Sequence, residues 1–443
     1  MALESAGYKK LTAIQEQAIP ELLKGNDLLG VAQTGTGKTA SFALPILQDI
    51  ATNENTSRKD RKIQSLIIAP TRELANQIGD SFKKYSKNLN IKTLTIYGGM
   101  SQHPQTKRLR QGVDILVATP GRLLDLIQQK HVHLNHVRHF VLDEADLMLD
   151  MGMLEDVQRI VKFLPKERQN MLFSATMPKE IEKLTKTLLN NPVKVEVTPV
   201  SSTVDTIDQQ IFMVDQGEKT NLLLHLLKDE SIESVLVFSR TKRGADQLVK
   251  ALRNNDHRAE AIHSDKSQRN RERALKNFKQ RKTRILVATD IAARGIDISQ
   301  LSHVVNYNLP EVPETYVHRI GRTGRSGNSG IALSFVSAQE RGMLRGVEQL
   351  IGKNLPVVKD HPFPAKETGG GKKKSNNRRR RGRKPANARG ARRGNKSNAE
   401  TSNKPNDKSK RKSKSKNKRN NDFKRGGRRK QQGGSRRRND SSK

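Results

Sequence analysis

A glycine-rich segment near the start of the chain carries the residue types of a phosphate-binding loop. The segment AQTGTGKT (32–39) lies between an apolar run and an amphipathic one, which is the strand–loop–helix setting that such a loop needs. Its glycines let backbone N–H groups approach phosphate oxygens, Lys38 can reach the β- and γ-phosphates, and Thr39 can hold Mg²⁺. A glycine-rich turn without a ligand is the simpler alternative, but the setting favours the phosphate site. Its candidate residues are Ala32, Gln33, Thr34, Gly35, Thr36, Gly37, Lys38 and Thr39.

The acidic quartet DEAD (143–146) follows the apolar run HFVL, so it also lies at the end of an expected strand. Asp143 suits a water-mediated contact to Mg²⁺, and Glu144 can orient or deprotonate an attacking water. An acidic run alone is most often a solvated helix start. Together with the phosphate loop upstream, the quartet predicts a nucleoside triphosphatase in which Lys38, Asp143 and Glu144 are catalytic.

A third segment, HRIGRTGR (318–325), has an arginine at every third position. Such a repeat usually marks a solvated face or a polyanion contact. Arg319, Arg322 and Arg325 follow an expected strand, from which they could reach the γ-phosphate and stabilise transition-state charge as an arginine finger does. We assign this catalytic role to Arg322 and Arg325. Because they lie in a different half of the chain from the phosphate loop, hydrolysis would require the two halves to close.

Short apolar, β-branched runs alternate with longer amphipathic segments over the first 360 residues, as in parallel α/β sheets that are covered on both faces. The expected strands cover residues 28–32, 65–70, 114–120, 139–146 and 170–176, then 234–240, 259–264, 284–290, 303–308 and 331–337. Polar residues cluster directly after these runs, and ligands of open α/β sheets bind at that edge. The pattern predicts two α/β domains with candidate sites at the strand ends.

The boundaries follow from changes in composition. A polar segment that contains Pro199 predicts a linker near 198–206, so we expect one domain at 1–198 and a second at 206–360. The tail at 366–443 holds 32 Lys/Arg and 5 Asp/Glu, a net charge of +27. Its lack of apolar residues predicts disorder. The charge favours a polyanion partner, most simply nucleic acid, without separating RNA from DNA.

Composition excludes several classes of protein. The chain has 443 residues and no cysteine, which rules out a disulfide framework and a cysteine-ligated metal site. The first residues lack the apolar core of a signal peptide, and no apolar run approaches the length of a membrane span. The histidines have no ligand spacing, so we expect no metal beyond the Mg²⁺ of a nucleotide. These features predict a soluble, intracellular protein.

The order and spacing of these motifs resemble the DEAD-box ATP-dependent RNA helicases over residues 5–360. The resemblance implies two tandem RecA-like domains, each with a parallel β-sheet flanked by helices, followed by the disordered basic tail. It also implies ATP and Mg²⁺ as ligands and RNA as the partner. The segment GYKKLTAIQ (7–15) is similar to the family's adenine motif, so Gln15 would read adenine. Asp297, in ATDIAARGIDI, would contact the ribose of the nucleotide.

The same resemblance assigns residues to RNA contact and to coupling. Ser174 and Thr176, in the sequence SAT, resemble the element that couples hydrolysis to RNA release, and His318 would link the site to the motifs of the first domain. The residues expected on the RNA are Pro70, Thr71, Arg72, Gly98, Gly99, Thr119, Gly121, Arg122, Gln268, Arg271, Thr289, Arg294 and Gly295.

Two features depart from the family pattern. The family has an aromatic residue before the adenine motif that stacks on the base, but this chain starts six residues before Gly7. Either the start lies further upstream, or Tyr8 or nothing takes that role. In addition, Leu-Thr-Ala stands at 11–13 where Pro-Thr-Pro is usual. Within the family, AIHSDKSQ (261–268) and a short core with a basic tail are most similar to bacterial RhlE-type proteins, which implies a cytoplasmic protein.

The expected function is ATP-gated remodelling of RNA. Two domains would close on ATP and RNA, bend a single strand by its backbone and open a few base pairs, with little sequence preference. Ribosome assembly or RNA turnover would be the setting, with ribosomal or RNA-decay proteins as candidate partners and no membrane. A non-enzymatic RNA scaffold and a DNA helicase are the alternatives. The complete catalytic set argues against the scaffold, and only a comparison of RNA with DNA separates the two helicases.

Overall fold

The computed structural model describes residues 8, 10–33, 35–53, 61–197, 207–293, 298, 301–324 and 330–366. The predicted linker at 198–206 lies outside these residues, and so does the predicted tail apart from Lys366.

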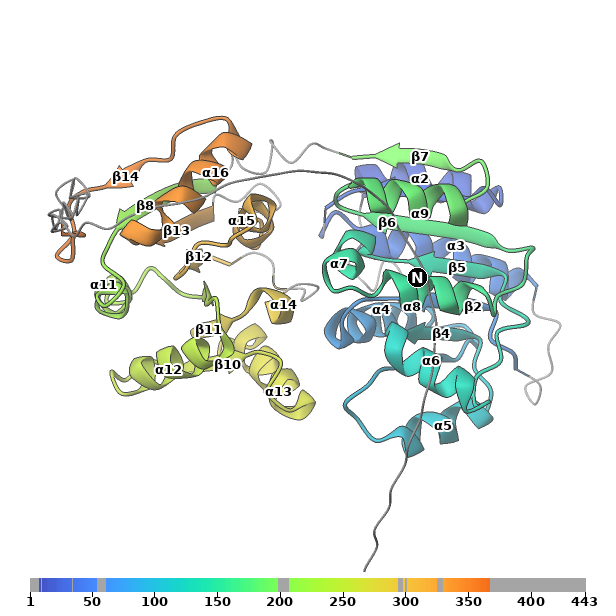
Figure 1. Ribbon diagram of the computed structural model, residues 1–443. Coiled ribbons are helices and arrows are strands. Elements are labelled where there is room, and N and C mark those ends of the chain that lie inside the picture. Colours follow the sequence, from blue (N-terminus) through green and yellow to red (C-terminus); the bar gives the residue numbers. More distant parts are fainter. Residues whose placement is uncertain are drawn as a thin grey trace, which may run out of the picture. The chain divides into compact units, whose positions relative to one another are not determined.

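Two parallel sheets of seven strands each form the framework (Figure 1). The first contains β1 (Leu28–Val31), β2 (Ser65–Ile68), β3 (Thr93–Ile96), β4 (Ile115–Ala118), β5 (His139–Leu142), β6 (Gln169–Ser174) and β7 (Val193–Glu196). The second contains β8 (Ile207–Met213), β9 (Val235–Phe238), β10 (Ala259–Ile262), β11 (Ile285–Ala288), β12 (His303–Asn306), β13 (Gly330–Val336) and β14 (Val357–Val358). Their orders are β3-β4-β2-β5-β6-β1-β7 and β10-β11-β9-β12-β13-β8-β14, which are the same order when each sheet is counted along the chain.

Helices pack on both faces of each sheet (Figure 1). The first half has α2 (Ala13–Leu23), α3 (Lys38–Thr52), α4 (Arg72–Tyr85), α5 (Gln102–Arg110), α6 (Pro120–Gln128), α7 (Ala145–Asp150), α8 (Leu154–Val161) and α9 (Lys179–Leu188). The second half has α11 (Lys219–Leu226), α12 (Lys242–Arg253), α13 (Gln268–Lys279), α14 (Asp290–Ala293), α15 (Pro313–Ile320), the 3-10 turn η1 (Ala338–Glu340) and α16 (Arg341–Ile351). In the described part of the chain, none of the helices combines the length and the apolar character needed to cross a membrane.

The central strands are buried on both faces because successive side chains of a strand point to opposite sides of the sheet. In β2, Leu66 and Ile68 enter the core beneath α6 and α8, whereas Ile67 packs beneath α3 and α4. In β9, Val237 faces α11 and α12 and Leu236 faces α13. Each sheet therefore separates two apolar layers, and its polar residues are left at the strand ends.

Several helices start at a polar residue three to five residues after the end of a strand. The hydroxyls of Thr71, Thr241 and Ser267 each accept a hydrogen bond from the backbone N–H three residues later, at 3.2, 3.0 and 3.3 Å, at the starts of α4, α12 and α13. Such a cap satisfies an N–H that has no partner within its helix. Thr71, predicted to contact RNA, therefore also fixes the start of α4.

The predicted fold class is confirmed, and each of the ten predicted strands is present. The strands β3, β7, β8 and β14 were not predicted. Three of them lie at sheet edges, where TLTI and VKVE alternate in polarity and β14 has only two residues, while β8 begins with the polar sequence IDQQ. Beyond residue 360 the chain still packs on the second sheet, because Phe363 contacts its core and the Ala365 N–H donates to the Met213 carbonyl at 2.8 Å.

Gly30 of β1 is predicted to be required for stability because it lies against a fully buried ring. A methyl group at Gly30 would lie 2.5 Å from a ring carbon of Phe173, which is fully buried against Phe42. Overpacking of this kind costs about 1–3 kcal/mol, so Gly30→Ala should lower the free energy of unfolding by that amount in urea titrations. The matched control is Gly121→Ala in α6, where an added Cβ atom would meet no described atom within 4 Å beyond its chain neighbours and the backbone of its own helix. Superimposable unfolding curves for Gly30→Ala and the wild type would contradict the prediction.

Candidate active site

The phosphate loop and the DEAD segment meet through a buried ion pair. Gly37 caps α3 in the left-handed region (φ 100°), and Lys38 is the first residue of the helix. The Lys38 Nζ lies 2.7 Å from the Glu144 Oε1 and 4.0 Å from the Asp143 Oδ1. All three side chains are less than a tenth exposed. The two motifs, 106 residues apart in sequence, therefore form one charged cluster at the strand ends.

Burial and charge shift the proton affinities in this cluster. Burial opposes the charge of Lys38, but the carboxylates of Glu144 and Asp143 outweigh it and hold the pKa of the ammonium above its ordinary value. Burial raises the pKa of Asp143 to about 7, against the opposing effect of Lys38. The Asp143 Oδ1 is buried and has no hydrogen-bond partner among the described residues. A carboxylate oxygen in this position is suited to a cation, directly or through water.

The backbone of Glu144 is strained. Its φ of 57° and ψ of 54° lie in the left-handed region, which costs a residue with a side chain on the order of 1–3 kcal/mol. Glu144 precedes α7, so this conformation turns the chain from β5 into the helix while the carboxylate stays on Lys38. Strain that the surrounding fold sustains is common at functional sites.

Gln15 holds the phosphate loop from the side of α2. Its Nε2 donates to the Gly37 carbonyl at 3.2 Å, and its Oε1 accepts from the Thr12 N–H at 3.1 Å. A Cβ atom at Gly37 would lie 2.5 Å from the Gln15 Nε2, so only glycine fits this approach. Gln15, predicted to read adenine, is thus buried and in contact with the loop that is predicted to hold the phosphates. Within that loop the Thr36 hydroxyl donates to the Gln33 carbonyl at 2.8 Å.

Tyr8 packs on the first domain. Its hydroxyl lies 2.6 Å from that of Tyr85 in α4, and the two rings meet edge to face with centroids 5.8 Å apart. Tyr8, the candidate to replace the family's adenine-stacking aromatic residue, is therefore held by Tyr85 of the core.

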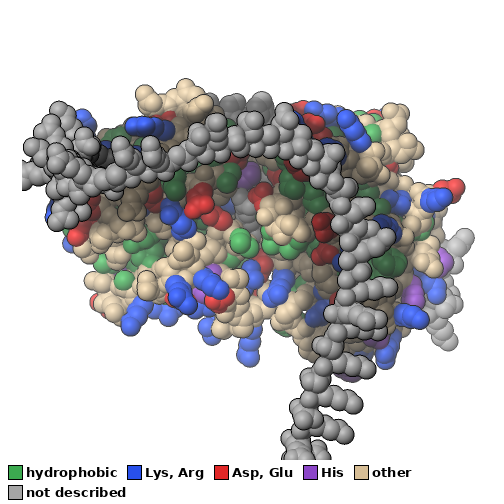
Figure 2. Space-filling model, in the orientation of Figure 1, with side chains coloured by type: hydrophobic (Ala, Val, Ile, Leu, Met, Phe, Trp, Pro, Cys, Tyr) green, Lys and Arg blue, Asp and Glu red, His purple; other side chains and the backbone are tan. Residues whose placement is uncertain are grey.

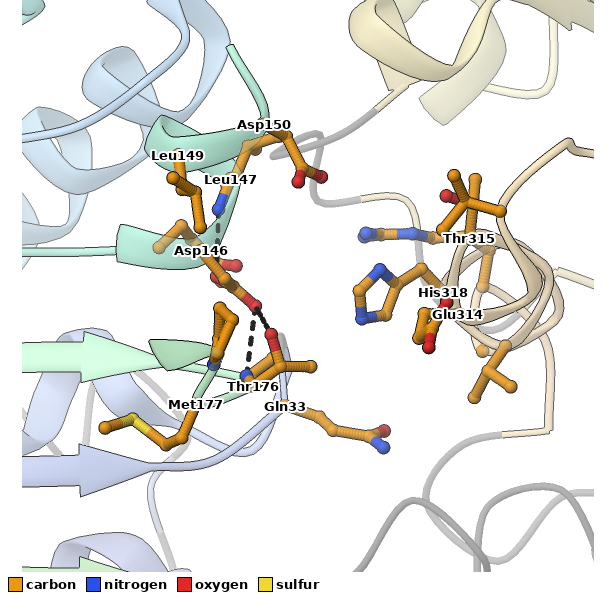
Figure 3. A pocket seen from close by; sticks show the side chains of 17 residues that line it. Gln33, Asp146, Leu147, Leu149, Asp150, Thr176, Met177, Glu314, Thr315 and His318 are labelled. Atoms are coloured by element: carbon orange, nitrogen blue, oxygen red, sulfur yellow. Dashed lines mark hydrogen bonds between the residues drawn. The ribbon is translucent and has the colours of Figure 1, made fainter. Parts of the chain in front are cut away.

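Asp146, which the sequence analysis did not assign, joins the DEAD segment to the SAT segment. Its Oδ2 accepts from the Thr176 N–H at 3.0 Å and from the Thr176 hydroxyl at 3.1 Å (Figure 3). The Ser174 hydroxyl accepts from the Asp146 N–H at 3.2 Å and donates to the Thr176 carbonyl at 2.8 Å. The predicted coupling residues Ser174 and Thr176 are thereby fixed to the helix that follows Glu144.

A pocket of about 520 Å³ connects these residues with α15 (Figure 3). Its lining includes Glu144, Thr176, His318 and Arg322. Figure 3 shows Thr176 and His318 on facing sides of the pocket. Apolar lining comes from Leu147, Leu149, Met177, Val312 and Val317. Arg322, predicted to be catalytic, is buried and lines the same pocket as the predicted base.

Arg319 has a different role from the one that the arginine repeat suggested. It is 2% exposed, and its Nε and Nη2 donate to the two oxygens of Asp290 at 2.6 and 2.7 Å. Its Nη1 donates to the Asn306 Oδ1 and the Asn308 carbonyl, and its guanidinium lies 4.9 Å from the Phe238 ring centre. Arg319, to which no catalytic role was assigned, therefore does not have the free guanidinium that an arginine finger needs. It instead fixes α15 to the start of α14.

Residues predicted to bind RNA gather beside α4. The guanidinium of Arg72 lies against Gly99, where a Cβ atom would come within 2.3 Å of its Nη1. The Arg122 Nη2 donates to the Met100 carbonyl at 3.3 Å, directly after the Gly98–Gly99 pair. The structure thus brings together three segments that are separate in sequence. Pro70 precedes this group, Thr119 directly precedes α6, whose second residue is Gly121, and Thr289 directly follows β11.

Glu73, another residue that the sequence analysis did not assign, contacts the second half of the chain. Its carboxylate accepts from the Gln268 Nε2 at 3.1 Å and from the Arg271 Nη2 at 2.9 Å. Arg72 also lies 3.4 Å from the Gln268 Oε1. Gln268 and Arg271, predicted to bind RNA, therefore engage a buried carboxylate of the first domain. The motif PTRELA contains Glu73, but its spacing alone does not reveal this partner.

Some predicted site residues lie outside the described part of the chain. They are Thr34 of the phosphate loop, Arg294 and Gly295 on the RNA side, Asp297 at the ribose and the second predicted finger, Arg325.

Comparison with known families gives two matches that together cover both halves. The DEAD/DEAH box helicase model matches residues 12–184, and the helicase conserved C-terminal domain matches residues 218–327. The DEAD-box ATP-dependent RNA helicase CshA of Streptococcus pneumoniae is 45% identical over 357 residues, 81% of this chain and 67% of that protein. CshA of Listeria monocytogenes is 45% identical over 349 residues, 79% of this chain and 66% of that protein. The chain thus spans about two thirds of these relatives.

Solved structures share the two-sheet fold. Saccharomyces cerevisiae Dbp5 bound to RNA and ADP BeF3 is 32% identical, with a TM-score of 0.72 over 81% of this chain and 92% of that one. Mss116p bound to single-stranded RNA and AMP-PNP is 27% identical, with a TM-score of 0.73 over 82% of this chain and 76% of that one.

The Arg319–Asp290 pair generates a stability prediction. Arg319→Lys keeps the charge but loses the two-pronged hydrogen bonding, because an ammonium cannot donate along two parallel directions to one carboxylate. Hydrogen bonds to charged groups contribute about 1.5–3 kcal/mol, so the free energy of unfolding of the second domain should fall by that amount in urea titrations. The control is Arg341→Lys at an exposed position, where a change within about 0.5 kcal/mol is expected. Equal effects of both substitutions would refute the role given to Arg319.

Proposed function

This chain belongs to the DEAD-box family and is an ATP-dependent RNA helicase, and from that premise we propose that it remodels RNA by ATP-gated closure of its two α/β domains. The observation that carries the proposal is the Lys38–Glu144–Asp143 cluster, whose Glu144 lines the same pocket as Arg322 of the second half. A base and an arginine from different halves lining one pocket are what closure-dependent hydrolysis requires.

We propose that Asp143 and Thr39 hold the Mg²⁺ of the nucleotide. The buried Asp143 Oδ1, which accepts no hydrogen bond from the described residues, fits a cation, and Thr39 directly follows Lys38 at the start of α3. The bound ion would neutralise charge on the β- and γ-phosphate oxygens. The residues of the loop, including Ala32, Gln33, Gly35 and Thr36, would hold the phosphates by their backbone.

In the proposed mechanism, Lys38 exchanges its hydrogen-bond partner Glu144 for the nucleotide. When Lys38 transfers its hydrogen bond from Glu144 to a γ-phosphate oxygen, the Glu144 carboxylate becomes available to orient the attacking water and accept its proton. Arg322, with Arg325 as its proposed companion, would stabilise the charge that develops on the transferred phosphoryl group. Asp146 holds Ser174 and Thr176, and we propose that this link passes the change at Glu144 to the RNA-binding segments.

On the RNA, we propose backbone recognition with little sequence preference. Arg72, Arg122 and the Gly98–Gly99 pair would contact phosphates and ribose from the first half, and Thr289, Arg294 and Gly295 from the second. The Glu73 contacts with Gln268 and Arg271 favour a joint between the two halves beside the RNA. A strand bent along this track cannot stay in a regular duplex, so a few base pairs would open.

The setting and the subfamily are also proposals. We propose a cytoplasmic role in ribosome assembly or RNA turnover, with ribosomal or RNA-decay proteins as partners. The basic tail would tether RNA near the core. The RhlE-type resemblance rests on the segment 261–268 and on the tail. Because the two relatives described above carry the name CshA, the RhlE-type assignment stays a prediction.

Glu144→Gln tests the mechanism. The amide cannot accept the proton of the attacking water, so RNA-stimulated ATP turnover should fall by about 10²–10⁴-fold. The measurement is steady-state ATPase activity without nucleic acid, with RNA and with DNA of the same sequence. The matched control is Glu155→Gln, an exposed carboxylate of α8, which should keep wild-type turnover. Undiminished turnover in Glu144→Gln would exclude the mechanism, and equal stimulation by DNA and RNA would exclude RNA selectivity.

Truncation after Ala365 tests the tail. Removing its net charge of +27 should raise the RNA concentration needed for half-maximal ATPase stimulation, because counterion release supplies most nonspecific affinity. Turnover at saturating RNA should stay at the level of the full chain. The same RNA dependence with and without the tail, at low and at moderate salt, would reject the tether.

A further inference from the structure

A recess of about 250 Å³ lies beside the outermost strand of the second sheet, away from the active-site pocket. It is formed between α12 and β10, and β10 has a neighbouring strand on one side only. Its charged lining consists of Asp246, Lys250 and Arg253 of α12 and Lys266 of the segment after β10. Val249 and Ala261 supply its apolar lining. In Figure 2, Lys and Arg side chains stand along the lower edge of the view, over α12 and α13.

Two cations of the recess are available for a ligand. Lys250 and Arg253 are exposed and three residues apart, so they stand on the same side of α12. The Arg253 Nε donates to the Ala259 carbonyl at 2.8 Å, which fixes the guanidinium at the start of β10. Among the hydrogen bonds and ion pairs of the described residues, none occupies the Lys250 ammonium or the terminal nitrogens of Arg253.

The acidic residue of the recess is already paired. The Asp246 Oδ1 lies 2.8 Å from the Lys266 Nζ and 3.0 Å from the Nε2 of the buried His263. Burial favours the protonated form of Asp246, but the neighbouring Lys266 and His263 side chains outweigh it and hold the pKa of this carboxyl below its ordinary value. Asp246 therefore stays ionised and neutralises Lys266, so the net positive charge of the recess comes from Lys250 and Arg253.

We infer that this recess binds a backbone phosphate of RNA and extends the RNA track along α12, an inference that rests on the proposed function. Lys250 and Arg253 hold the phosphate, and Val249 and Ala261 contact the adjoining ribose. RNA is favoured over an acidic peptide because Lys266 of the recess lies two residues before Gln268, which is predicted to contact RNA and begins α13. An RNA strand that leaves Gln268 would thus meet Lys266 first and the two cations of α12 next.

The test uses the full chain with Lys250→Glu and Arg253→Glu combined. ATPase turnover is measured against the concentration of a short and a long single-stranded RNA at several salt concentrations. For the long RNA, the half-stimulating concentration of the variant should be higher than that of the wild type. In a plot of the logarithm of this concentration against the logarithm of the salt concentration, the slope should fall by about 0.7 for each phosphate that the variant no longer neutralises. For the short RNA, which ends within the motif-lined track, the half-stimulating concentration should stay unchanged. Turnover at saturating RNA should equal that of the wild type.

The matched control reverses one arginine and one lysine on the opposite side of the same domain. Arg345→Glu with Lys359→Glu changes the charge equally but lies on α16 and just after β14, at the other edge of the sheet. This pair should leave both RNAs unaffected. The single substitution Lys250→Gln, at an exposed side chain, guards against misfolding and should give a smaller shift in the same direction.

The possible outcomes separate this inference from the proposed function. A wild-type chain that RNA does not stimulate overturns the proposed function itself. A stimulated wild type with the same half-stimulating concentration and salt slope as the Lys250→Glu/Arg253→Glu chain overturns the recess alone. An equal shift for the short RNA, or for the control pair, overturns it as well, because the effect would then be general electrostatics.

Discussion

The buried ammonium of Lys38 is the interaction on which the rest of the active site depends. A buried charge without a partner costs several kcal/mol, so the loop after β1 has to meet the carboxylates after β5. β6 lies between these two strands, and the parallel arrangement brings all three carboxyl ends to one edge of the sheet. Gln15 then holds the loop and Asp146 holds the SAT segment. Both contacts involve segments that the Lys38–Glu144 ion pair holds together.

The central part of the fold could be predicted because its strands are short, continuous apolar runs such as SLII in β2 and VLVF in β9. The edge strands β3, β7 and β14 could not, since β3 and β7 alternate in polarity and resemble a loop, and β14 has only two residues. In the site, Lys38 and Glu144 could be predicted because each belongs to a motif at a strand end. The pairs Glu73–Arg271 and Arg319–Asp290 could not, because spacing along the chain does not encode which distant side chain a residue meets.

The arginine repeat shows this limit most clearly. Arg319 and Arg322 have the same local spacing, but α15 ends at Ile320. Arg319 therefore stays on the helix and points to Asp290, whereas Arg322 follows the turn into the active-site pocket. Gly99 gives a second example, since a position predicted to approach RNA is also the one that leaves room for the guanidinium of Arg72. Residues of the site thus shape one another before any ligand is considered.

The two sheets share their strand order, and each half also has a lysine at the same place relative to its first strand. Lys219 begins α11, the first helix after the first strand of the second sheet, just as Lys38 begins α3 in the first. Lys219 is fully buried, and its Nζ donates to the carbonyls of Tyr307 and Phe335 and to the Glu340 carboxylate. Duplication of one ancestral sheet, followed by loss of phosphate binding from one copy, would leave this arrangement. The lysine of the second copy would then remain as an anchor of the fold, bound to a carboxylate of its own chain in place of a phosphate.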